Sequence, residues 1–239
     1  MCRRATAANR SESWAMFGKI TTFVKDIMRS RRRVFGPALL TNEDRHLAQT
    51  HLRYHDHGIL RGRWTNLEEI SPGVWRSNQP DPERIAVHAH DGIKTILSLR
   101  GDGNSGHYLL EKEACAAHGI PLLSIGLSAR KAAPKADYLA LLDQFEVLPR
   151  PFLFHCKSGA DRTGLASAFY LLHIDQAPLD VAREQLGLKY LHVKWSATGI
   201  LDAILDAYGA HLKAHGPTPL RDWITDHYDA DAITQKFRG

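Results

Sequence analysis

The stretch Phe152-Leu-Phe-His-Cys156-Lys-Ser-Gly-Ala-Asp161-Arg162-Thr163-Gly164 decides how this chain is expected to fold. Its brief apolar beginning, Phe152–His155, predicts a strand buried in a parallel sheet. Five residues separate Cys156 from Arg162, where a helix is expected to begin. Backbone N–H groups around such a loop point inward, and the start of the helix adds unpaired donors and positive potential. The stretch therefore predicts a cradle for a tetrahedral dianion at the end of a buried strand.

Three residues of this stretch suit phosphate chemistry. Gly159 gives the tight curve its backbone freedom, and Arg162 can hold two phosphate oxygens through its planar guanidinium. At the floor of the cradle the same field favours the thiolate of Cys156, lowering a pKa that is about 8.5 in a free cysteine. We therefore expect Cys156 to be an ionised nucleophile placed for in-line attack on phosphorus.

Strands and helices alternate on both sides of this stretch. Besides Phe152–His155, the sequence predicts strands at Val74–Arg76, Ile93–Leu99 and Pro121–Ile125. Helices are predicted at 81–91, Tyr108–His118, Pro134–Leu148, Thr163–Ile174, Leu179–Leu186, Thr198–Ala214 and Leu220–Tyr228. Asp81 is expected to cap the first of them. This alternation predicts an α/β fold with a central, mostly parallel sheet of about four or five strands flanked by helices. The last helices form a helical C-terminal region that is expected to pack against this layer.

Charge is distributed unevenly along the 239 residues. Residues 1–35 hold nine Lys and Arg but only two Asp and Glu, whereas the remainder holds 22 basic and 24 acidic side chains. This contrast predicts a basic N-terminal segment, 1–35, and a domain at 36–239 with its core at 70–175 and its helical part at 176–239. Because the domain itself is not basic, we expect no nucleic-acid partner.

Apolar residues recur at helical spacing from Trp14 to Met28, and Arg29 opens an arginine cluster that ends at Arg33. An amphipathic helix followed by basic residues could contact an anionic membrane surface through 14–33, or pack on the main domain with its arginines in water. No apolar run approaches the roughly 20 residues of a membrane-spanning helix. With only three cysteines, a reducing compartment is the simpler interpretation, and a cytoplasmic protein is expected.

The arrangement His155-Cys156, five residues, Arg162-Thr163-Gly164 resembles the signature of cysteine-dependent protein tyrosine and dual-specificity phosphatases. The segment Trp75–Pro80 is similar to one seen in bacterial atypical members, and the resemblance extends from about Val74 to Leu172. It implies that Cys156 forms a phosphocysteine and that Arg162 binds the phosphoryl group. His155 would help to hold the thiolate, and Thr163 would steady it as the leaving group. The residues expected to bind substrate are Lys157, Ser158, Gly159, Ala160 and Arg100.

The general acid is left open by the sequence. Related phosphatases usually place an aspartate on the loop before the cradle strand, but residues 126–133 contain no carboxylate. Asp161 is the first candidate, because some lipid and bacterial atypical phosphatases resemble this chain in carrying an aspartate directly before the arginine. Asp102 is the second candidate and Asp137 the third. The alternative for Asp161 is a structural acceptor of hydrogen bonds.

Two substrate classes and one different function remain at this stage. The family resemblance favours phosphotyrosine or phosphorylated protein, whereas Lys157, Asp161 and the basic N-terminus together favour a phosphoinositide-like acidic phospholipid. A phosphate-binding adaptor at a membrane surface, without catalysis, would use the same cradle. The chain is rich in histidine, but pairs such as His55 and His57 lack a third metal ligand, and the predicted chemistry needs no metal or other cofactor.

Overall fold

The computed structural model describes residues 22–31, 33 and 35–238. Of the helix predicted between residues 14 and 28, the part before residue 22 lies outside the described residues, and residues 22–31 are helical. Among the described helices we find none with the length and apolar character that a bilayer crossing requires.

The chain divides into two units. The first runs to Ile59 and includes Gly103–Leu110, and the second comprises Leu60–Asp102 and Glu111–Gly239. The boundary predicted after residue 35 falls inside the first unit and stays a prediction. In the first unit, helix α2 (Asn42–Thr50) continues into a π-helical turn, η1 (His51–His55). A small apolar cluster fills this unit, formed by Phe35, Leu39, Leu47, Ala48, Leu109 and Leu110.

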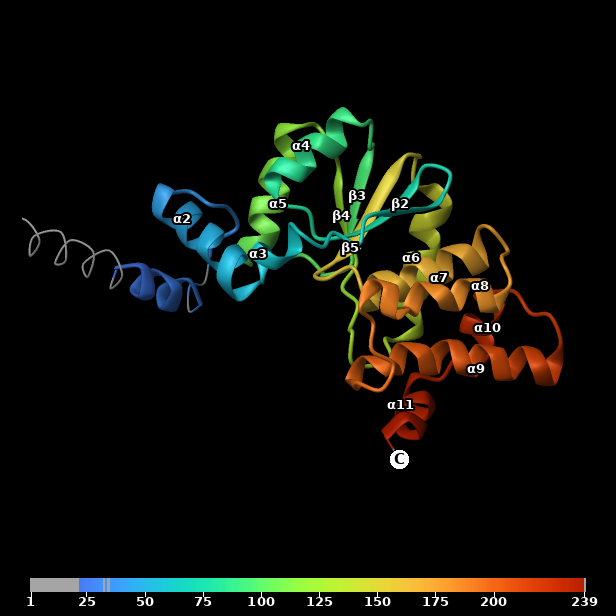
Figure 1. The fold of residues 1–239 in the computed structure, drawn as a ribbon. Coiled ribbons are helices and arrows are strands. Elements are labelled where there is room, and N and C mark those ends of the chain that lie inside the picture. Colours follow the sequence, from blue (N-terminus) through green and yellow to red (C-terminus); the bar gives the residue numbers. More distant parts are fainter. Residues whose placement is uncertain (1–21, 32, 34, 239) are drawn as a thin grey trace, which may run out of the picture. The chain divides into compact units, whose positions relative to one another are not determined.

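The second unit is built on a five-stranded sheet (Figure 1). Its strands are β1 (Glu68–Ser71), β2 (Val74–Asn78), β3 (Thr95–Ser98), β4 (Leu122–Ser124) and β5 (Phe152–Cys156). They lie in the order β1-β2-β5-β3-β4, and all neighbours are parallel except β1 and β2. The predicted mostly parallel α/β fold is therefore confirmed. Strand β1 was not predicted, because its Glu-Glu-Ile-Ser sequence has little apolar character to mark a strand.

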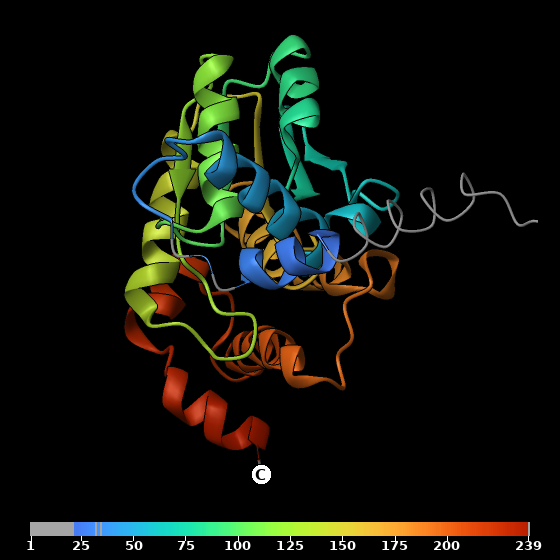
Figure 2. The same ribbon diagram turned by 90° about the vertical axis from the view of Figure 1, so that its left-hand side faces the viewer.

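The helices after η1 follow the predicted pattern and add two that were not predicted, α3 at the start and α11 at the end. They are α3 (Gly58–Arg61), α4 (Pro82–His90), α5 (Gly106–Ala117), α6 (Lys135–Val147), α7 (Asp161–His173), α8 (Leu179–Arg183), α9 (Ile200–His215), α10 (Leu220–Asp226) and α11 (Ala230–Arg238). The side chain of Asp81 caps α4 by accepting the N–H of Arg84, as the sequence indicates. Figure 2 shows the red C-terminal helices at the end of the unit remote from α4.

Side chains of β5 alternate between the two faces of the sheet. One face packs into the large hydrophobic cluster beneath α6 and α7 and contributes Phe152, Phe154 and Cys156. The other face contributes Leu153 to a separate hydrophobic cluster, which includes Ile85 of α4. Cys115 of α5 belongs to the same separate cluster as Leu153. The two buried cysteines of the second unit therefore pack on opposite faces of the sheet.

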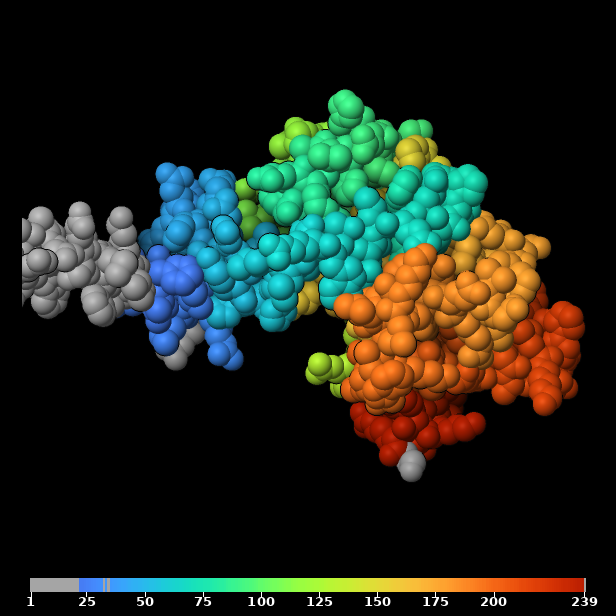
Figure 3. Space-filling view, viewed as in Figure 1, coloured from blue at the N-terminus to red at the C-terminus, as the bar shows by residue number. Residues whose placement is uncertain are grey.

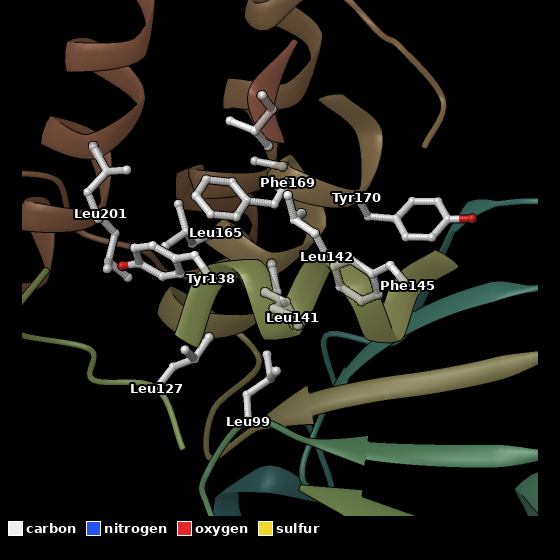
Figure 4. Close-up of a cluster of buried hydrophobic side chains, with 14 of the residues drawn as sticks. Leu99, Leu127, Tyr138, Leu141, Leu142, Phe145, Leu165, Phe169, Tyr170 and Leu201 are labelled. Atoms are coloured by element: carbon white, nitrogen blue, oxygen red, sulfur yellow. The ribbon is translucent and has the colours of Figure 1, made fainter. Parts of the chain in front are cut away.

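The large cluster is a densely aromatic layer between α6 and α7 (Figure 4). Tyr138 of α6 meets Phe169 of α7 edge to face, with ring centroids 5.1 Å apart. Leu141 and Leu142, one turn further along α6, are completely buried beside them. This layer fixes α7 against the sheet and therefore fixes the residues at its N-terminus.

Replacing Leu141 by Ala is expected to lower the free energy of unfolding by about 2–5 kcal/mol, because it opens a cavity in this layer. Val147→Ala, at the end of the same helix where the side chain is 72% exposed, is the matched control and is expected to change it by less than about 0.5 kcal/mol. Urea unfolding measures both. Equal effects of the two substitutions would show that this layer does not hold the unit together.

Candidate active site

The predicted cradle follows β5. Cys156 ends the strand, the loop Lys157–Ala160 (the cradle loop) follows, and α7 begins at Asp161, one residue earlier than predicted. Gly159 has a positive φ of 72°, and a Cβ there would lie 2.7 Å from the backbone nitrogen of Asn78. Only glycine fits both the left-handed backbone and this close approach. The sequence prediction for Gly159 thus has a direct steric reason.

The carbonyl groups of the cradle loop point away from the sulfur and are bonded from outside. The oxygen of Lys157 accepts from Nη1 of Arg61 at 3.4 Å, and that of Ser158 accepts from Nδ2 of Asn66 at 2.9 Å. The oxygen of Gly159 accepts from Nη2 of Arg76 at 2.6 Å, and the helical turn of α7 occupies the oxygen of Ala160. With the carbonyls held outward, the N–H groups of Gly159 and Thr163 are directed at the sulfur of Cys156. The arrangement is a nest of amide donors, which suits an anion.

The sulfur of Cys156 lies at the floor of this nest. The residue is 1% exposed, and burial by itself would raise the pKa of its thiol. The charge of Arg162, the hydroxyl and N–H of Thr163 and the N–H of Gly159 outweigh burial and hold the pKa below its usual value of 9.0. The same groups that stabilise a thiolate would stabilise a bound phosphate.

Arg162 is held by backbone oxygens at the carboxyl edge of the sheet. Its Nη1 lies 3.4 Å from the oxygen of Leu99, just after β3, and 3.4 Å from that of Leu127. Its Nε is buried and has no hydrogen-bond partner among the described residues. The guanidinium is therefore oriented from one side and keeps donors for two oxygens of a phosphate.

Behind the nucleophile lies a buried polar chain that the sequence did not predict. His155 is completely buried, with Nδ1 3.2 Å from the oxygen of Cys156 and Nε2 2.6 Å from Oε1 of Glu111. The other oxygen of Glu111 accepts from Nε2 of Gln79 at 2.8 Å, and Oε1 of Gln79 accepts from Arg100. The ring of His155 thus contacts the main chain at Cys156, and its predicted help in holding the thiolate stays a prediction. Arg100 is bonded to Gln79, and its predicted contact with substrate stays a prediction.

Arg76 explains why the segment Trp75–Pro80 matters. It is completely buried, donates to the oxygen of Gly159, and lies 3.4 Å over the ring of Tyr190. Burial lowers the pKa of Arg76 to about 10, partly offset by Tyr190, so the guanidinium stays charged at neutral pH. The sequence marks this segment by its resemblance to bacterial atypical phosphatases but predicts no role for Arg76.

The three candidate proton donors occupy different settings. Asp161, the first residue of α7, places Oδ1 2.7 Å from Nδ1 of the buried His192, whose Nε2 lies 2.7 Å from Asp202. Asp102 is exposed on the loop after β3, and Asp137 lies in the first turn of α6 as predicted. The roles of all three stay predictions. His192 and Asp202 were missed because they are 30 to 40 residues beyond the cradle, with no local pattern.

No group of three or more His, Cys, Asp or Glu side chains in the described part of the chain is arranged to hold a metal ion. The side chains that the structure gathers at the cradle are instead those suited to binding an oxyanion.

We expect the ultraviolet absorbance of the thiolate, measured as wild type minus Cys156→Ser, to titrate below the pKa of an ordinary cysteine. The thiolate then persists to a lower pH than in an ordinary cysteine and is lost as the pH falls through the lowered pKa. Thr163→Val, which removes the hydroxyl but keeps the shape, should move the midpoint upward. A midpoint at or above 9.0 in the wild-type protein would contradict the described electrostatics.

Comparison with known proteins agrees with this geometry. A family model described as the tyrosine phosphatase family matches residues 125–191. Over 123 residues the chain is 28% identical to the dual specificity protein phosphatase TpbA of Pseudomonas aeruginosa, covering 51% of this chain and 53% of that protein. The chain thus spans about half the length of the curated relatives it matches.

The fold is shared with solved structures. A crystal structure of a DUF442 protein from Shewanella putrefaciens is 17% identical, covers 64% of this chain and 94% of the other, and superposes with a TM-score of 0.50. The signature around Cys156, the sheet order and the matched segment agree with one another. By its signature and its matched segment this chain is similar to cysteine-dependent tyrosine and dual-specificity phosphatases, in particular to those of the bacterial atypical type.

Proposed function

We propose that this protein is an enzyme that hydrolyses phosphomonoesters through a phosphocysteine intermediate. The observation that carries the proposal is the Cys156 thiol, buried beneath inward-facing amides and Arg162 with its pKa lowered. The thiolate attacks phosphorus, a sulfur–phosphorus bond forms, and the bond from phosphorus to the ester oxygen breaks. Water then attacks the phosphocysteine, releasing inorganic phosphate and restoring the thiolate, which the Thr163 hydroxyl stabilises as it leaves.

The departing ester oxygen takes up a proton in the first step. Asp161 remains our first candidate for the donor, ahead of Asp102 and Asp137, because it directly precedes Arg162. One of its oxygens is engaged by His192, and its side chain keeps 22% of its surface exposed. A positioned general acid increases the rate of such a reaction by about 10²–10⁴-fold, and the increase is largest for substrates with a basic leaving group.

For the substrate class we propose phosphotyrosine and other phosphorylated protein side chains. The relative from P. aeruginosa is named a dual specificity protein phosphatase, and the matching family model is described as a tyrosine phosphatase family. A phosphoinositide-like lipid is the second candidate, favoured by Lys157, which is half-buried in the cradle loop and adds a cation beside the nest.

Peripheral contact with an anionic membrane through residues 14–33 belongs to the second candidate. In the described half of this segment, Val24 and Met28 lie one helical turn apart and are 43% and 64% exposed. Their helix also carries basic residues, and residues 14–33 hold six basic side chains but only one acidic side chain. Such a helix face suits an anionic lipid surface.

Cys156→Ser is expected to abolish hydrolysis of a generic aryl phosphate, because serine at neutral pH is not ionised and cannot attack phosphorus. Cys115→Ser is the matched control and should retain turnover, since Cys115 lies on the opposite face of the sheet and burial raises its pKa to about 12. Steady-state kinetics measure both. Turnover by Cys156→Ser would end the phosphocysteine mechanism, and no turnover by the wild type would favour a phosphate-binding adaptor.

The two substrate classes are separated by Lys157→Ala. If lipid headgroups with several phosphates are substrates, removing this cation should lower kcat/KM for phosphoinositides roughly tenfold more than for phosphotyrosine peptides. For a phosphotyrosine enzyme, which we favour, the wild type should prefer the peptides and the substitution should affect both classes similarly. Lys213→Ala, in the last turn of α9, controls for a general loss of charge. Wild-type preference for phosphoinositides would overturn the proposed substrate class.

A further inference from the structure

A buried histidine joins the start of α7 to the C-terminal helices. The side chain of His192 is completely buried, and each ring nitrogen lies 2.7 Å from a carboxylate oxygen. Nδ1 contacts Asp161, the first residue of α7, and Nε2 contacts Asp202 of α9. The ring therefore bridges two acidic side chains that are 41 residues apart in the sequence.

These contacts define the protonation of the ring. When Asp161 and Asp202 are both ionised they only accept hydrogen bonds, so both ring nitrogens donate, which requires an imidazolium. In the proposed reaction Asp161 carries a proton only for its transfer to the leaving group. Burial opposes the charged ring, but the hydrogen bonds and charges of Asp161 and Asp202 raise the pKa of His192 from 6.5 to about 9. The bridge is therefore complete at neutral pH and is lost as the pH rises through about 9.

Asp202 gives the bridge a fixed end. Its neighbours along α9, Leu201, Ile204 and Leu205, are buried in the large core cluster. Only 11% of the Asp202 side chain is exposed, so the carboxylate has little freedom to leave the ring. The imidazolium consequently has a rigid anion on one side and the start of α7 on the other.

The segment that carries His192 is also linked to the cradle loop, through Asn66 and Arg76. Nδ2 of Asn66 donates both to the oxygen of Ser158 and to that of Tyr190, and the Tyr190 ring lies against Arg76. In the space-filling view the orange part of the surface, where residues near 190 fall on the colour bar, adjoins the cyan part formed by residues before β2 (Figure 3). Movement of the segment would therefore disturb the groups that hold the loop carbonyls outward.

The charge of the ring matters for an anion bound at the cradle. Asp161 and Arg162 are the first two residues of α7, so the Asp161 carboxylate and a phosphate dianion held by Arg162 would share the N-terminus of one helix. Without a cation between them, Asp161 and Asp202 would repel each other and the phosphate would meet an unbalanced negative charge. The imidazolium offsets this charge and pulls the first turn of α7 into place.

We propose that His192 is a positioning residue of the phosphate-binding site: its bridge from Asp161 to Asp202 holds Arg162 and the loop amides in the arrangement that binds phosphate. This inference rests on the proposed phosphatase function, since it concerns the same site. His192 and Asp202 both lie beyond residues 125–191, the segment that matches the tyrosine phosphatase family model. The bridge is therefore a contribution of the C-terminal helical region to the cradle.

The test is the affinity of the Cys156→Ser protein for inorganic phosphate, measured by titration calorimetry from neutral to alkaline pH. The affinity should fall with a midpoint near pH 9 as the bridge is lost. Adding Asp202→Asn removes one of the two carboxylates that raise the pKa of His192, so the midpoint should move to lower pH. Adding His192→Gln should weaken binding at neutral pH by roughly tenfold or more and remove the alkaline fall.

His173→Gln is the matched control, because His173 also contacts a carboxylate, Glu146, but at the far end of α7. It should bind phosphate as the parent does. Arg76 is another buried group whose pKa, about 10, lies in the alkaline range. It contacts Gly159 and not His192, so Asp202→Asn is expected to move the midpoint only if His192 causes the alkaline fall in affinity. Circular dichroism detects whether the His192→Gln protein folds. If it does not fold, the midpoint of phosphate affinity in Asp202→Asn tests the proposal instead.

An unchanged midpoint in folded Asp202→Asn, parent affinity in His192→Gln, or no phosphate binding by the parent at any pH would each overturn the proposal. Turnover of an aryl phosphate by the wild type is a separate measurement. Turnover without the predicted pH dependence of binding would reject the role of His192 alone. The predicted dependence without turnover would reject the proposed function alone.

Discussion

The site depends on the backbone of the cradle loop being held with its carbonyls outward and its N–H groups inward. Arg61, Asn66 and Arg76 each donate to one successive carbonyl of this loop. If these donors were absent, a loop carbonyl could turn toward the sulfur, and its partial negative charge would oppose a thiolate. The buried polar side chains around the loop are thus part of the electrostatics of the nucleophile.

This requirement explains why so many polar groups are buried near one cysteine. Arg76 is completely buried yet keeps partners in Gln185, Gly159 and the ring of Tyr190. Glu111 and His155 form a second buried pair directly behind the strand end. Buried charges are costly unless they are paired and hydrogen-bonded, so their concentration here marks a place where geometry matters more than apolar packing. The aromatic layer between α6 and α7 provides the rigid support.

The sequence predicted the parts of the molecule that depend on local pattern. The strand–loop–helix around Cys156, the glycine at 159 and the capping of α4 by Asp81 follow from residue type and spacing, and the structure agrees. The sequence does not predict the roles of Glu111, His192 and Asp202. Each of them contacts a residue at least ten positions away in the sequence, and the residues around each form no recognisable motif. Strand β1 was missed for a related reason, since pairing with β2 rather than its own composition makes it a strand.

The central claim is that the cradle loop and Arg162 together form an oxyanion site over the sulfur of Cys156. A crystal structure of the protein with bound tungstate, a stand-in for phosphate, tests it most directly. The account predicts the anion beside Sγ of Cys156, with the loop N–H groups and the Arg162 guanidinium donating to its oxygens and the loop carbonyls still facing outward. An anion bound elsewhere, or a loop whose carbonyls face the sulfur, would contradict it.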